Sequence, residues 1–343
     1  MREPELQFPP FRPKWWLRGP HAQTIGSVYY PYRLPEQKTI EHVVELEDGD
    51  RLVLHENCVP ASRQEPLVAP YLHPDPTGRV IILVHGLGGS HRSLHVARLA
   101  YKLAAHGWTC LRMDQRGCGS GLTLAKRPTH AGRSEDLAAV VRFVQSRWPQ
   151  RPITLIGFSL GGNVLLKLLA EYGSQPPAEL DSAVAVAPPI DLATCADNLQ
   201  QGSNWFYDRI FLRALNRLVQ ERRDRVDGCA DIQLRSAPTS LLDFDNRYTA
   251  PLAGFRDAQE YYQECSAARR LSSICVKTWI ITSRDDPLVP FRIFTDVHLG
   301  SGTALHATTH GGHLGFIEQN GKESDPFWLD WRLMEIIASL ANS

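Results

Sequence analysis

A serine in the middle of the chain has the neighbours that a nucleophilic serine needs. It stands in the sequence GFSLG at 157–161, after the apolar run 152–158 and before a helical pattern over 161–172. A sharp strand-to-helix turn brings the backbones two residues before and after the serine into contact, so both positions require glycine. The turn also places the hydroxyl near a helix N-terminus, which favours developing negative charge. The spacing therefore predicts Ser159 as a nucleophile.

A serine hydroxyl reacts when a base takes its proton and an acid holds that base in place. The acid is expected where the strand predicted over 276–283 ends, and Asp285 and Asp286 follow there. We assign Asp286, because the adjacent proline ends the strand and fixes the turn; the reverse assignment to Asp285 stays open. His313, in a glycine-containing loop after a further strand, is the predicted base. The order Ser159, Asp286, His313 is typical of such a serine site.

Acyl transfer also needs donors for an oxyanion, and two backbone N–H groups are candidates. The HGLGG run at 85–89 can present the N–H of Leu87, and the N–H of Leu160 directly follows the nucleophile. The glycines of this run do not have the spacing of a phosphate-binding loop. The histidines near the C-terminus lack the further ligands that a metal site needs. We expect no cofactor and no metal.

These residues need a rigid frame, and the sequence predicts one. Residues 39–57 indicate an antiparallel hairpin around an Asp-Gly turn. Continuous apolar runs then alternate with helical stretches, which is typical of a parallel sheet with helices on both faces. The runs lie at 80–85, 109–114, 152–158, 182–187, 276–283 and 305–309, and the helical stretches at 91–106, 134–147, 161–172 and 327–340. We expect an α/β protein with a mostly parallel, doubly wound sheet.

The alternation stops between 188 and 273, where helical periodicity replaces the strand pattern. Apolar and cationic side chains lie there on separate helical faces, and we interpret the cationic face as solvated. We expect this segment to form a helical lid over the site, lined by Trp205, Phe206 and Phe211. The expected organisation is an N-terminal arm at 1–38, a core at 39–187 and 274–343, and the lid at 188–273.

The composition of the chain argues against some classes of binding partner and some cellular compartments. The 37 Lys and Arg residues balance 37 Asp and Glu residues, so no net positive field attracts nucleic acid. Seven cysteines without a C-x-x-C pair argue against a disulfide framework and are typical of a reducing cytoplasm. The start lacks the pattern of a secretory signal, and the apolar stretches are far shorter than the ~18 residues that a membrane span needs. We expect a cytoplasmic protein without an integral membrane segment; its oligomeric state is not predicted.

Further stretches resemble one known family. They are KWWLRGPHAQTI at 14–25, THAGRSEDL at 129–137, the block 241–262, SRDDPLVP at 283–290 and THGGHLGF at 309–316. With the serine, acid and histidine motifs in their order, they resemble the α/β-hydrolase fold superfamily and, within it, the YheT-like esterases, relatives of abhydrolase-domain lipases. The resemblance implies a serine hydrolase of carboxylic, often acyl-lipid, esters, with Ser159, Asp286 and His313 as its triad.

The expected function is therefore that of a cofactor-free serine esterase that forms an acyl-enzyme. Its expected partner is a small-molecule acyl ester of short to medium chain or of acylglycerol type. Two alternatives stay open: an acyltransferase with the same triad, and a catalytically silent scaffold that binds a ligand. We interpret the pair Trp15 and Trp16 as packing a terminal arm onto the core, with transient contact with a lipid surface as the alternative.

Overall fold

The computed structural model describes residues 8–58, 77–229, 236–319 and 323–341. An eight-stranded sheet runs through its centre in the order β1-β2-β4-β3-β5-β6-β7-β8. The strands are β1 (Thr39–Glu45), β2 (Arg51–Asn57), β3 (Val80–Val84), β4 (Thr109–Asp114), β5 (Ile153–Phe158), β6 (Leu180–Val186), β7 (Lys277–Ser283) and β8 (Thr303–Thr308). The pairs β1-β2 and β2-β4 are antiparallel, and all other pairs are parallel. The predicted hairpin and the mostly parallel sheet are confirmed.

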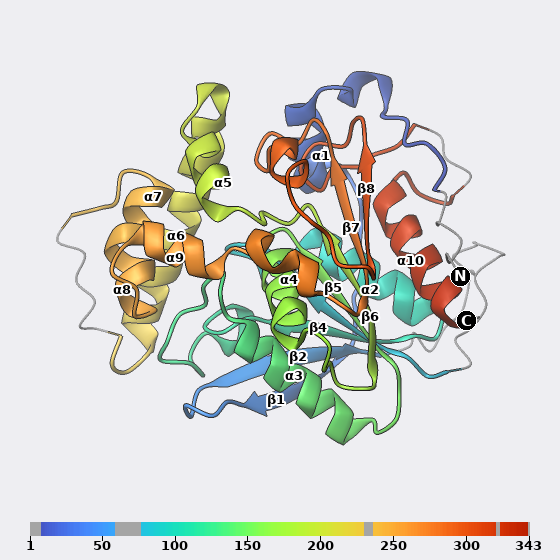
Figure 1. Ribbon diagram of the computed structural model, residues 1–343, viewed down its shortest axis with the longest axis horizontal. Helices are drawn as coiled ribbons and strands as arrows, with labels where there is room; N and C mark the ends of the chain where they lie inside the picture. The colour runs from blue at the N-terminus through green and yellow to red at the C-terminus, as the bar shows by residue number, and fades with distance from the viewer. Residues whose placement is uncertain (1–7, 59–76, 230–235, 320–322, 342–343) are drawn as a thin grey trace.

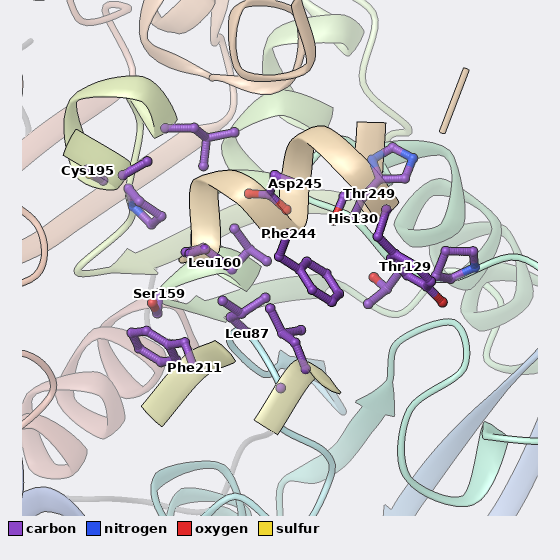
Figure 2. Close-up of a pocket in the computed structure, with 18 of the residues that line it drawn as sticks. Leu87, Thr129, His130, Ser159, Leu160, Cys195, Phe211, Phe244, Asp245 and Thr249 are labelled. Carbon is purple, nitrogen blue, oxygen red and sulfur yellow. The ribbon is translucent and has the colours of Figure 1, made fainter. Parts of the chain in front are cut away.

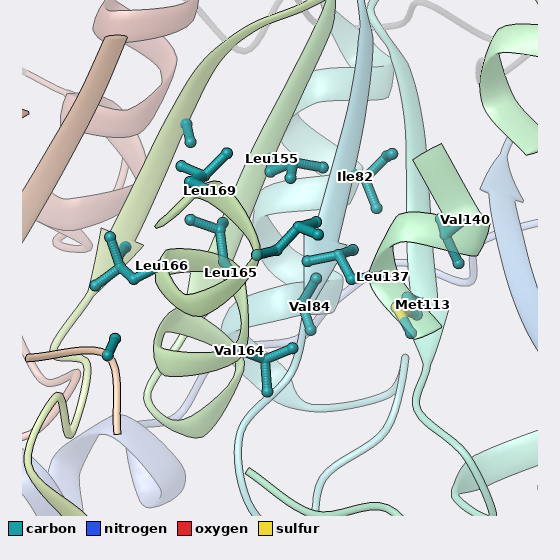
Figure 3. Close-up of a cluster of buried hydrophobic side chains, with 14 of the residues drawn as sticks. Ile82, Val84, Met113, Leu137, Val140, Leu155, Val164, Leu165, Leu166 and Leu169 are labelled. Atoms are coloured by element: carbon teal, nitrogen blue, oxygen red, sulfur yellow. The ribbon is translucent and has the colours of Figure 1, made fainter. Parts of the chain in front are cut away.

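Helices cover both faces of the sheet, as predicted (Figure 1). They are α2 (Leu94–Ala105) and α10 (Trp328–Ala341) on one face, and α3 (Ser134–Arg147) and α4 (Leu160–Tyr172) on the other. Alternate residues of β3 belong to the two different cores: Ile81 and Leu83 face α2, whereas Ile82 and Val84 face α3 and α4 (Figure 3). A central strand buried on both faces therefore appears in the sequence as a continuous apolar run.

The described chain between β6 and β7 is helical, in agreement with its sequence pattern. It contains α5 (Leu192–Leu199), α6 (Trp205–Arg225), α7 (Leu241–Phe244), a π-helical turn (Asp245–Thr249), α8 (Ala250–Leu252) and α9 (Ala258–Cys265). Figure 1 shows most of these helices gathered at the left of the sheet. Their action as a lid and the domain boundaries given above stay predictions.

The N-terminal arm forms a 3-10 turn, η1 (Trp15–Leu17), and the helix α1 (Pro20–Tyr29). Figure 1 shows α1 near the ends of β7 and β8. The interpretation that the tryptophan pair packs on the core is wrong, because Trp15 is 70% and Trp16 is 53% exposed. Leu17 packs inward instead, against Ile317 and Phe327, because η1 turns its third side chain towards the protein. Within the described residues, none of the helices combines the length and the apolar character of a membrane span.

Candidate active site

Ser159 lies on the sharp turn between β5 and α4. Its backbone has φ 50° and ψ −120°, a conformation that costs free energy for a residue with a side chain. A Cβ at Gly157 would lie 2.5 Å from the carbonyl oxygen of Gly161, and a Cβ at Gly161 would lie 2.5 Å from that of His85. Both glycines are therefore required: Gly157 because it meets the backbone of Gly161, as the sequence spacing indicated, and Gly161 because it meets the backbone at the end of β3. The turn holds the hydroxyl clear of the sheet.

The structure brings Ser159, His313 and Asp286 together. The Nε2 atom of His313 lies 2.9 Å from the Oγ atom of Ser159, and its Nδ1 atom lies 2.8 Å from the Oδ2 atom of Asp286. The other carboxylate oxygen of Asp286 accepts hydrogen bonds from the backbone N–H groups of Leu288 (2.8 Å) and Val289 (2.9 Å). With Nδ1–H donated to the carboxylate, Nε2 is free to accept the serine proton. The arrangement can therefore convert the hydroxyl into a nucleophile.

Asp285 has other partners. One of its carboxylate oxygens accepts a hydrogen bond from the backbone N–H of Gly312 at 2.9 Å. The other lies 3.2 Å from Nδ1 of His310, an exposed residue. Asp285 thus holds the loop that carries His313, and Asp286 is the carboxylate that contacts the imidazole. In this geometry the open choice between the two acids favours Asp286.

The two predicted oxyanion donors lie beside the serine. Leu87 and Leu160 line the same pocket as Ser159 and His313. Leu160 is the first residue of α4, and such an N–H has no partner inside its own helix. The glycine loop passes close to the nucleophile, because a Cβ at Gly86 would lie 3.1 Å from the Cβ of Ser159. Both residues therefore lie near the nucleophile, and their role as oxyanion donors stays a prediction.

His85, at the start of this loop, has a structural role. Its Nδ1 atom lies 2.8 Å from the carbonyl oxygen of Gly86, to which it donates, and Nε2 accepts from the backbone N–H of Gln115 at 3.1 Å. Burial lowers the pKa of the imidazole below its ordinary value, so the ring is neutral at physiological pH. The ring ties the glycine loop to the end of β4.

A pocket with mostly apolar walls contains the serine. Its walls include Phe211, Leu215, Leu218 and Val219 of α6, with Leu241 and Phe244 from the α7 segment. In Figure 2, Ser159 and Thr129 lie on opposite sides of this pocket, with Leu87 and Phe244 between them. Such a shape suits an acyl chain extending from a reacting carbonyl.

The prediction of lining residues is correct for one of three side chains. Phe211 lines the pocket, but Trp205 and Phe206 do not, and their side chains are 58% and 45% exposed. Phe206 lies on the far side of α6 from the lining residues, and Trp205, in the first turn, lies about a quarter turn away from them. The apolar stripe of the helix faces the pocket, and neither residue belongs to that stripe.

Sequence reasoning did not find a buried carboxyl group in the pocket wall. Asp245 begins the π-helical turn and accepts a hydrogen bond from the hydroxyl of Tyr262 at 2.7 Å. Burial raises the pKa of Asp245 to about 6. Asp245 lies in the block 241–262, one of the stretches that resemble the YheT-like esterases, and π-helical turns are frequent at functional sites. Nearby His130 also lines the pocket, and burial lowers its pKa to about 3.

The second feature that sequence reasoning missed is the contact of α1 with the histidine loop. The Oγ1 atom of Thr24 accepts a hydrogen bond from the backbone N–H of His313 at 2.9 Å. The buried side chain of Gln23 accepts from the N–H of Ile317 (2.8 Å) and donates to its carbonyl oxygen (3.1 Å). A Cβ at Gly312 would lie 2.5 Å from the carbonyl oxygen of Pro20. The N-terminal arm therefore holds the loop of the candidate base.

One cluster of described residues has the composition of a metal site. The imidazoles of His55 and His91 both lie against the Oδ2 atom of buried Asp114, at 3.0 and 2.7 Å, and their rings stack at 3.5 Å. The same oxygen accepts a hydrogen bond from the N–H of Ser120 at 2.8 Å. Hydrogen bonds thus satisfy this carboxylate fully, and the expectation that no metal is needed stays a prediction.

The sequence also has identifiable relatives. Residues 79–319 match the alpha/beta hydrolase fold family. The chain is 32% identical over 257 residues to YheT of Escherichia coli (strain K12), which is named as an esterase, and the match covers 74% of each chain. It is 29% identical over 245 residues to the mouse phospholipase ABHD3, covering 71% of this chain and 59% of the mouse protein. The chain thus spans less than two thirds of that second relative.

Solved structures share the fold. The Pyrococcus furiosus esterase Pf2001 matches with a TM-score of 0.55 at 17% identity, over 97% of this chain and 99% of that one. Mouse alpha/beta hydrolase domain-containing protein 10 matches with a TM-score of 0.52 at 13% identity, over 88% and 99%. At these identities the likeness concerns the fold alone. From the sequence matches, the chain belongs to the alpha/beta hydrolase fold family and, within it, to the YheT-like esterases.

Proposed function

We propose that this protein is a serine hydrolase of carboxylic esters. The observation that carries the proposal is the hydrogen-bonded series from Ser159 through His313 to Asp286 in the wall of an apolar pocket. Relatives named as esterase and phospholipase support ester hydrolysis as the class of reaction.

The proposed reaction has two halves, formation of an acyl-enzyme and its hydrolysis, and the serine, the histidine and the aspartate act in both. The Oγ atom of Ser159 attacks the ester carbonyl while Nε2 of His313 takes its proton, and the alcohol then leaves with that proton. Asp286 holds the Nδ1–H tautomer of the ring and stabilises the imidazolium. The N–H groups of Leu87 and Leu160 stabilise the tetrahedral oxyanion. A water molecule repeats the sequence on the acyl-enzyme and releases the acid.

The apolar walls support an acyl chain as the bound part of the substrate. We propose short- to medium-chain or acylglycerol-type esters, with residues 188–273 acting as the lid, since α6 and α7 supply much of the wall. No step in this reaction requires a cofactor. A cytoplasmic location remains a prediction.

The experiment measures the release of free acid from p-nitrophenyl acyl esters of increasing chain length. Wild-type protein should release acid, and Ser159→Ala should lower kcat by about 10³ to 10⁶, because the three residues act as a unit. An added alcohol should not divert most of the acyl group. If the ester of that alcohol is the main product, the protein is an acyltransferase; if wild type and Ser159→Ala are equally inactive, the silent scaffold is correct.

A further inference from the structure

The exposed apolar side chains of this protein are concentrated in two segments. Of the eleven large apolar side chains exposed among the described residues, eight lie in η1, α1 and the first turns of α6. They are Trp15, Trp16, Ile25, Val28 and Tyr29 in the N-terminal arm, and Trp205, Phe206 and Ile210 in α6. Soluble monomers seldom gather exposed aromatic groups in this way without a binding partner.

The two segments touch each other. The Nδ1 atom of His21 in α1 lies 2.9 Å from the hydroxyl of Tyr207 in α6, and the two rings stack with centroids 5.7 Å apart. Ile25 and Val28 follow His21 by four and seven residues, so they lie on the same face of α1 as this contact. Phe206 and Ile210 flank Tyr207 along α6. The apolar groups of both helices therefore extend from one shared contact.

The charged side chains that these segments expose are cationic. Residues 8–35 contain four cationic side chains (Arg12, Lys14, Arg18 and Arg33) and no Asp or Glu, although the whole chain has a net charge of zero. In the first turns of α6, Arg209 and Arg213 are exposed. The only acid there, Asp208, is buried and accepts hydrogen bonds from Gln200 and from the backbone of Leu241. We name the eight apolar groups with Arg18, Arg209 and Arg213 the apolar-cationic surface.

The same two helices form part of the candidate active site. The buried face of α6 lines the pocket, and Thr24 of α1 holds the backbone of His313. A partner bound to the apolar-cationic surface would therefore lie against the elements that enclose Ser159.

We propose that the apolar-cationic surface docks this protein onto an anionic lipid bilayer. Tryptophan and tyrosine rings favour the boundary between lipid tails and headgroups, and arginine pairs with lipid phosphate. A second copy of this chain fits less well, because a two-fold contact through this surface would oppose like charges. The proposal adds a place of action to the proposed function, and its test does not depend on hydrolysis.

The test is flotation of the full chain with vesicles of phosphatidylcholine alone and of phosphatidylcholine mixed with phosphatidylglycerol. Wild type should bind the mixed vesicles at least about tenfold more strongly, because each cation near an anionic surface contributes roughly fivefold. Arg209→Glu/Arg213→Glu should abolish that preference. Trp205→Ser/Phe206→Ser should weaken binding to both vesicles about tenfold or more, since two aromatic groups no longer leave water.

The matched control is Ile40→Ser/Val43→Ser, which removes two equally exposed apolar groups from the edge strand β1 and should bind as wild type does. All three variants should keep the far-UV circular dichroism spectrum and the thermal unfolding midpoint of wild type, which shows that they are folded. The proposal is overturned if the wild-type protein binds neither kind of vesicle, or binds both kinds with equal affinity. It is also overturned if the surface variants instead abolish a concentration-dependent dimer, which would make a second copy the partner.

Discussion

Asp285 and Asp286 are neighbours with different partners, and a pair of matched substitutions separates their roles. Asp286→Asn leaves an amide beside Nδ1 of His313 and favours the wrong tautomer, so kcat should fall by about 10² to 10⁴. Asp285→Asn changes only contacts with Gly312 and His310 and should lower kcat less than about tenfold. The measurement is kcat for a p-nitrophenyl ester with each variant. A larger loss in Asp285→Asn would reverse the assignment of the acid.

From the sequence, the acid could be placed only at one of two neighbouring positions. A proline after the second aspartate indicates where the strand ends, but the direction of each side chain depends on the backbone of the turn. The N–H groups of Leu288 and Val289 fix that direction, and their position follows from the folded loop.

Asp245 predicts a pH dependence of stability. Burial raises its pKa from 3.8 to about 6 in the folded protein. Between these values the folded protein keeps a proton that the unfolded chain has lost, so this group lowers the free energy of unfolding as pH rises through that window. Asp245→Asn removes the titration and keeps an acceptor for Tyr262. Relative to wild type, the variant should gain up to about 3 kcal/mol of stability on going from pH 4 to pH 8.

Urea denaturation of both proteins at the two pH values checks this prediction. The remaining carboxyl groups titrate in both proteins, so their contribution cancels in the difference. A difference in unfolding free energy that does not change with pH would show that Asp245 is not a buried titrating group.

At the scale of elements, α1 connects the N-terminal arm to the loop of the candidate base. Thr24→Val keeps the size of the side chain but removes the acceptor for the N–H of His313, so kcat should fall about tenfold with little change in KM. Thr24→Ser restores the hydroxyl and should recover most of the rate. Ser27→Ala is the control on the same helix, because the Ser27 hydroxyl donates to the carbonyl oxygen of Thr24 and has no other hydrogen bond among the described residues.

Steady-state kinetics with the three variants decide the point. Equal kcat values for Thr24→Val and Ser27→Ala would mean that α1 stabilises the fold without positioning the histidine.

The strands and covering helices could be predicted because each has a local pattern. The apolar runs that became β3 to β8, and the hairpin of β1 and β2, were placed to within about three residues. The contact of α1 with the histidine loop had no such pattern, since Thr24 and His313 are separated by most of the chain. Trp205 and Phe206 are exposed because they lie outside the apolar stripe of α6 that faces the pocket, so an aromatic side chain alone does not indicate a lining residue.

At the scale of the whole molecule, two parts of the sequence form one pocket: the strands of the sheet and the helices between β6 and β7. The sheet presents Ser159, Asp286 and His313 at the carboxyl ends of β5, β7 and β8, and the helices between β6 and β7 supply the apolar walls. The family match over residues 79–319 includes β3 to β8 of this sheet. The role of the serine is the step that needs a direct measurement.

That measurement is reaction of the native protein with a fluorophosphonate, followed by peptide mass spectrometry. A serine activated as proposed should form one covalent adduct on Ser159, and His313→Ala should slow its formation by several orders of magnitude, because the base no longer takes the proton. Ser159→Ala should form no adduct. If wild type does not react, or if Ser159→Ala reacts equally, Ser159 is not the nucleophile and the proposed hydrolase mechanism is wrong.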